Sequence, residues 1–102
     1  MLRGYVLSLN ADQDLQGIFG YIAANSGIKR AEAVLTELED AFVILSESPS
    51  LGRIRYDLSG FPRSWVVLRW LIFYEPVDAN RILVLRVVDG SRDLAALLKL
   101  VK

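Results

Sequence analysis

The chain has neither histidine nor cysteine among its 102 residues. Without histidine it cannot build a Ser-His-Asp or Cys-His nucleophile system, nor an imidazole metal site. Without cysteine it has no disulfide framework, which is compatible with the cytoplasm. Neither common glycine-rich phosphate loop is present. We therefore expect no metal ion and no cofactor, and an enzyme built from this chain would rely on Arg, Lys, Tyr, Asp or Glu.

Long apolar runs are also missing. The longest block, Trp65 to Tyr74, is interrupted by Arg69 and is much shorter than the ~20 residues that a membrane-spanning helix needs. The first fourteen residues lack the extended apolar region and small-residue cleavage site of a signal peptide. We expect a cytoplasmic protein without membrane contact.

The length and composition indicate one folded domain over residues 1–102. Hydrophobic residues make up 53% of the chain, a share that argues against disorder. This is more apolar surface than one small core is expected to hide, so we expect a protein partner.

Charge is unevenly distributed although its sum is zero. Residues 1–50 hold three basic and seven acidic groups, whereas residues 51–102 hold nine basic and five acidic groups. The asymmetry suggests either an anionic partner for the second half or two halves that complement each other in the fold. The excess is far below that of a strongly basic nucleic-acid-binding domain.

The first half of the sequence predicts a strand followed by a helical hairpin. The strand covers Tyr5–Leu9, and Asn10 is the predicted N-cap of a helix over 11–25, with Gln13 completing a capping-box pattern. A second amphipathic helix is predicted over 28–47. The short Ser-Gly connection makes the pair an αα-hairpin.

The second half predicts a sheet. Residues 53–63 form a loop or a short strand, and 64–68 with 70–75 form two strands or one bent strand. A turn is predicted over 76–80 and a strand over 81–88, and a leucine-rich segment from Leu94 to Leu98 suggests a closing helix or strand. The fold class is α+β, with the helical hairpin packed on one face of a mostly antiparallel, curved sheet.

Arginines interrupt the apolar segments of this half. Arg69 and Arg86 either serve the structure, by reaching solvent or pairing with Glu75 or Asp89, or they contact a partner. Arg92 beside Asp93 is either an exposed ion pair of little energetic value or a further contact. The two tryptophans, Trp65 and Trp70, are interpreted as core residues.

Four segments contain a recognisable set of residues in a fixed order: Tyr5, Ala11, Asp14, Leu15, Tyr21, Ile22, Pro49, Gly52, Arg53, Ile72, Phe73, Tyr74, Arg86, Val87, Gly90, Arg92, Asp93 and Leu94. In these residues the chain resembles the ParE branch of the RelE/ParE toxin superfamily. They span nearly the whole chain. The resemblance implies the same helical hairpin on a curved antiparallel sheet.

The resemblance also implies a function. ParE-like proteins are toxins of type II toxin–antitoxin systems, and those with an assigned target act on DNA gyrase and block replication. A ParD-type antitoxin wraps the toxin with its C-terminal segment and holds it inactive. We expect a tight complex, a heterotetramer or larger. The sister RelE branch instead cleaves messenger RNA in the ribosome.

The residues favour the ParE branch over RelE. A RelE-type nuclease uses a cluster of cations and commonly a C-terminal tyrosine at the scissile phosphate. Arg69 and Arg92 fall near two such cationic positions, but Leu97 and Leu98 stand where the tyrosine would be useful. Zero net charge is also poor for docking onto ribosomal RNA. We expect no catalytic residues and action by binding, with a RelE-type endoribonuclease or an inactive relative as alternatives.

Two sets of residues are predicted to make the contacts, and we expect no direct sequence-specific binding of nucleic acid. The target-binding set is basic: Arg53, Arg55, Arg69, Arg86 and Arg92. The antitoxin-binding set lies on the helical hairpin: Leu15, Phe19, Leu35 and Phe42.

Overall fold

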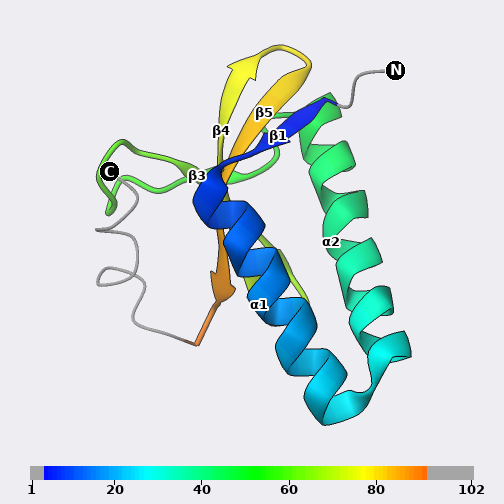
Figure 1. The fold of residues 1–102 in the computed structure, drawn as a ribbon. Coiled ribbons are helices and arrows are strands. Elements are labelled where there is room, and N and C mark those ends of the chain that lie inside the picture. Colours follow the sequence, from blue (N-terminus) through cyan, green and yellow to red (C-terminus); the bar gives the residue numbers. More distant parts are fainter. Residues whose placement is uncertain (1–3, 92–102) are drawn as a thin grey trace.

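A computed structural model describes residues 4–91 as one mixed sheet covered by two helices (Figure 1). The helices are α1 (Leu9–Ser26) and α2 (Ile28–Glu47). The strands are β1 (Tyr5–Leu7), β2 (Arg53–Ile54), β3 (Arg63–Val67), β4 (Trp70–Asp78) and β5 (Arg81–Asp89). The sheet order is β1-β5-β4-β3-β2, and only the β1–β5 pair is parallel. The predicted fold class is confirmed.

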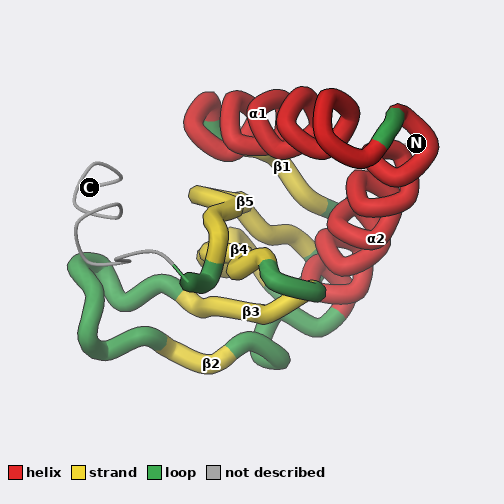
Figure 2. Tube along the Cα trace, turned by 90° about the horizontal axis from the view of Figure 1, so that it is seen from below, coloured by secondary structure: helices red, strands yellow, loops and turns green. Residues whose placement is uncertain are grey.

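The helical hairpin covers one face of the sheet (Figure 2). The main core lies between the two layers, where Phe42 and Leu38 of α2 meet Ile72 and Tyr74 of β4. A second, smaller apolar cluster lies on the opposite face and consists of Leu58, Leu71, Phe73, Leu85 and Val88. The strands β4 and β5 are therefore apolar on both faces, which explains their continuous runs of hydrophobic residues.

Helix α1 begins two residues earlier than the sequence suggested, because Ser8 is the N-cap and not Asn10. The Ser8 hydroxyl accepts a hydrogen bond from the Ala11 N–H at 3.0 Å and donates one to the Leu85 carbonyl at 2.8 Å. One side chain thus caps the helix and fixes its start against β5. The alternative cap, Asn10, is exposed.

The segment that leads into the sheet is fixed by a close approach between Gly52 and Tyr74. The buried Tyr74 hydroxyl donates to the Pro49 carbonyl and accepts from the Gly52 N–H, both at 2.8 Å. A Cβ on Gly52 would lie 2.4 Å from that hydroxyl, so only glycine fits. Burial raises the pKa of Tyr74 above its ordinary value.

Strands β3 and β4 are separate and are joined by a tight turn at Leu68 and Arg69. Arg69 therefore lies in a turn and does not interrupt a strand. The turn predicted at 76–80 is shorter in the structure, because β4 continues to Asp78 through Pro76. Proline is tolerated there because β3 ends its pairing opposite Tyr74, which leaves this part of β4 at an open edge.

Candidate functional site

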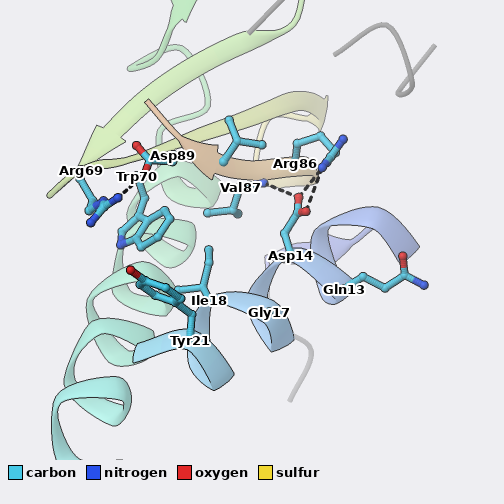
Figure 3. A pocket seen from close by; sticks show the side chains of 11 residues that line it. Gln13, Asp14, Gly17, Ile18, Tyr21, Arg69, Trp70, Arg86, Val87 and Asp89 are labelled. Atoms are coloured by element: carbon cyan, nitrogen blue, oxygen red, sulfur yellow. Dashed lines mark hydrogen bonds and ion pairs between the residues drawn. The ribbon is translucent and has the colours of Figure 1, made fainter. Parts of the chain in front are cut away.

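A groove of about 550 Å³ runs between α1 and the end of β5 (Figure 3). Gly17 and Tyr21 line it from α1, and Trp70 lines it from β4. Two of the predicted target-binding residues, Arg69 and Arg86, lie in this α1–β5 groove. The fold brings them together although they come from a turn and a strand.

Asp14 of α1 holds Arg86. The carboxylate of Asp14 accepts hydrogen bonds from Nε and a terminal nitrogen of Arg86 at 2.7 and 2.9 Å, and from the Val87 N–H at 3.0 Å. Both side chains are largely buried, and the carboxylate raises the pKa of Arg86. Asp14 also occupies the edge of β5 beyond the point where β1 stops pairing.

A β-bulge accounts for the direction of the Arg86 side chain. Phe73 of β4 pairs with Arg86, but the next residue, Tyr74, pairs with Val84, so Leu85 is an extra residue in β5. A bulge changes the strict alternation of side chains along a strand. The structure thereby turns Arg86 toward α1 while Val87 stays in the main core.

Arg69 is held by its neighbours in the same groove. Its guanidinium pairs with Asp89 and lies over the ring of Trp70 at 5.1 Å from the centroid. The hydrogen bond from Arg69 holds the pKa of Asp89 well below its usual range. With Asp14 and Asp89 each facing an arginine, the groove is close to electrically neutral and is a poor site for a phosphate.

The other two described arginines of the target-binding set lie on the sheet face away from the helices. Arg55 is buried, pairs with Asp57 at 2.8 Å and lies over the Phe73 ring at 5.6 Å from its centroid. Arg53 is exposed, and its guanidinium makes no hydrogen bond or ion pair with any residue of 4–91. Both border an apolar recess of about 600 Å³ formed with Leu51, Val66 and Leu71.

Three residues of the antitoxin-binding set share one groove on the helical hairpin. Leu15, Phe19 and Leu35 line a mostly apolar groove of about 400 Å³ together with Leu7. The carboxylate residues Asp12 and Glu39 flank this hairpin groove. The fourth residue, Phe42, is 0% exposed and packs on the Tyr5 ring at 5.1 Å between centroids. It supports the groove from within the core and does not reach the surface.

Arg92 lies outside the described residues, as does the leucine-rich segment from Leu94 to Leu98. The sequence did not reveal the partner of Arg86, because Asp14 is 72 residues away. Sequence reasoning also missed Tyr56 and Phe61, two exposed aromatics in the 53–63 segment. Aromatic residues within such a polar, turn-rich segment were an available signal.

Within residues 4–91, no group of three or more Asp or Glu residues is arranged to hold a metal ion. Neither described helix is long and apolar enough to cross a membrane.

The fold of the chain has a counterpart among solved structures. The structure is similar to a chain of the chromosomal ParDE TA system from P. aeruginosa, with a TM-score of 0.71, 16% identity and coverage of 84% of this chain and 94% of that one. At this level of identity the similarity shows the fold alone.

Comparison of the sequence with known proteins identifies the family. The family described as ParE toxin of type II toxin-antitoxin system, parDE, matches residues 5–94. Toxin ParE3 of Caulobacter vibrioides is 38% identical over 83 residues, which cover 81% of this chain and 82% of that protein. The chain belongs to the ParE toxin family of type II toxin–antitoxin systems, and membership of such a system implies an antitoxin partner.

Proposed function

We propose that this toxin stops growth by binding and inhibiting DNA gyrase, without catalysis, and that a ParD-type antitoxin neutralises it in the cytoplasm. The observation that carries the proposal is the match of the ParE toxin family over residues 5–94. The structure adds surfaces on which two partners can act separately: the hairpin groove and the outer face of the sheet.

On the target side, the ion pairs divide the predicted arginines into two groups. Arg55, Arg69 and Arg86 each have a carboxylate partner, which reduces what they can offer to a target. Arg53 makes no close ion pair with a carboxylate among residues 4–91, so we propose Arg53 as the leading target contact. Arg92 remains a proposed contact outside the described residues.

On the antitoxin side, we propose that the hairpin groove receives a segment of the antitoxin. Leu15, Phe19 and Leu35 offer apolar contacts, and Asp12 and Glu39 favour a segment whose apolar side chains are flanked by Lys or Arg. The complex is proposed to be a heterotetramer or larger, which mass measurement of the purified complex would test.

The decisive experiment is supercoiling by purified gyrase with and without the toxin. Inhibition with trapped cleaved DNA, relieved by the antitoxin, is the expected result. Growth arrest in cells with no effect on gyrase would favour ribosome-dependent cleavage of messenger RNA. Absence of both effects would make the protein an inactive relative.

The groove assignment predicts that Phe19→Ala weakens antitoxin binding by at least about tenfold, as expected for loss of an apolar anchor. Calorimetric titration against the antitoxin measures this. Ile28→Ala is the matched control, because Ile28 is exposed at the connection between the helices and does not line the groove. Equal affinities of the two variants would contradict the assignment.

A further inference from the structure

The loop between β2 and β3 displays two aromatic rings to solvent. Tyr56 is 73% exposed and Phe61 is 60% exposed, and their ring centroids lie 5.7 Å apart at an interplanar angle of 55°. In Figures 1 and 2 this loop projects from the sheet on the side away from α1 and α2. The fold gives neither ring a place in a core, so burial in the isolated chain does not explain the pair.

The loop is held in place although its tip is exposed. The backbone N–H of Arg55 donates to the Pro62 carbonyl at 2.8 Å. Two successive turns are closed by hydrogen bonds from the Leu58 N–H to the Arg55 carbonyl and from the Phe61 N–H to the Leu58 carbonyl. Leu58 is buried in the second apolar cluster, and the bidentate pair of Arg55 with Asp57 packs over Phe73. The two rings are therefore presented on a preorganised support, which lowers the entropic cost of binding.

The backbone at Phe61 adds an independent observation. Phe61 has φ 49°, in the left-handed region where a bulky residue is an outlier, directly after Gly60 at φ 81°. Glycine at position 61 would adopt this conformation more easily. A strained position occupied by a large exposed ring is a feature of binding sites and not of stability.

The charge beside the rings indicates what they bind. Residues 53–63 contain three arginines and a single acidic residue, and the exposed guanidinium of Arg53 makes no hydrogen bond or close ion pair within residues 4–91. The apolar recess beside Arg53 continues this surface along the sheet. We call Arg53, Tyr56 and Phe61, with the recess, the aromatic loop surface.

We propose that the aromatic loop surface is where the toxin docks on its protein target, against a patch that carries carboxylates around an apolar hollow. The inference deepens the proposed function and rests on it. Tyrosine and arginine are the residues most enriched among binding hot spots, and the rings supply the apolar anchor. A nucleic acid fits less well, because the rings pack on each other at a tilt and a single arginine without a close ion pair neutralises few phosphates.

The test compares four purified full-length toxins for binding to immobilised gyrase subunits and for inhibition of supercoiling. Tyr56→Ala and Phe61→Gly are expected to weaken binding by about 30-fold, the scale of a hot spot. Val77→Ala is the matched control, because Val77 is an exposed apolar residue on β4 and not part of the loop, and this variant should bind as the wild type does. Phe61→Gly should also unfold at the same or a higher urea concentration, because it relieves the strained φ.

The outcomes separate the two proposals. If the wild type binds gyrase and the loop variants bind equally well, the proposal that the aromatic loop surface contacts the target is wrong, and the proposed function stands. If the wild type itself neither binds gyrase nor inhibits it, the proposed function is wrong and the docking proposal falls with it. Parallel loss of affinity for the antitoxin would assign the loop to that partner. If the wild type binds single-stranded DNA in a salt-sensitive manner and both loop variants lose this binding, the ligand of the aromatic loop surface is a nucleic acid and not a protein.

Discussion

Asp14 is the residue through which the helical layer holds the sheet at the α1–β5 groove. Its carboxylate accepts three hydrogen bonds from Arg86 and Val87. Replacing Asp14 by Asn removes the negative charge that the carboxylate places against the largely buried guanidinium of Arg86. We expect Asp14→Asn to lower the free energy of unfolding by about 3 kcal/mol, at the lower end of what breaking a buried ion pair costs. Urea denaturation measures this.

The control for this prediction is Asp12→Asn. Asp12 lies on the exposed side of the same helix, and its carboxylate accepts a hydrogen bond from the Gln16 side chain at 3.0 Å. Its replacement should change the free energy of unfolding by less than about 0.5 kcal/mol. Similar losses for the two variants would mean that the negative charge of the first turns matters and not the contact with Arg86.

For single residues, the sequence shows that Arg86 needs an ion-pair partner or access to solvent, but it does not show which residue the partner is. A charge within the apolar strand 81–88 had to be paired or reach solvent, and Arg86 is paired. The partner was not predictable, because the bulge at Leu85 resets the alternation of side chains and Asp14 lies in a distant element. The same limit applies to the site: Phe42 was assigned to the antitoxin surface, yet it lies in the main core, where the tilted ring of Tyr5 packs on it.

Among the elements, the start of α1 gives the sharpest test. The Ser8 hydroxyl both caps α1 and bonds the Leu85 carbonyl, so Ser8→Ala removes a cap and leaves a strand carbonyl unpaired. We expect a loss of about 1–2 kcal/mol in the free energy of unfolding. Thermal and urea unfolding monitored by circular dichroism measure the loss.

The comparison variant is Asn10→Ala, which should be close to neutral because Asn10 is exposed and is not the cap. A larger loss for Asn10→Ala than for Ser8→Ala would contradict the observed cap. The sequence favoured Asn10 because Gln13 follows at capping-box spacing. The competing contact of Ser8 is with a residue 77 positions away, which no local pattern can reveal.

Element types were otherwise predictable because periodicity is a local property. The second helix was predicted over 28–47 and is observed at Ile28–Glu47, where a regular apolar stripe faces the sheet. The connection at Leu68 and Arg69 was left open, since neither residue is typical of a tight turn. The structure forms it with Leu68 at φ 56°, a conformation that leucine seldom adopts.

For the whole molecule, the exposed ion pairs predict acid sensitivity. Hydrogen bonds from Arg55, Arg81 and Arg69 lower the pKa values of Asp57, Asp78 and Asp89 below that of free aspartate. The unfolded chain therefore takes up protons first, at about pH 3.9. Stability that is present above this pH should fall as the pH drops through the lower pKa values of the folded state.

Unfolding midpoints measured from pH 6 to pH 2 test this dependence. Asp89→Asn should have a flatter profile below pH 4 than the wild type, because it removes the carboxylate with the largest shift. A profile as steep as that of the wild type would show that other groups control acid unfolding.

The parallel pair of β1 with β5 joins the two ends of the described chain, because Tyr5 pairs with Ile82 and Leu7 with Val84. A contact between such distant residues carries a high cost in loop closure, which slows folding. During synthesis the helical hairpin leaves the ribosome well before its sheet is complete. β5 lies between β1 and β4 and packs on both helices. A chain interrupted before residue 81 therefore lacks the strand that joins β1 to the rest of the sheet, and the apolar side of the hairpin is only partly covered until β5 has been made.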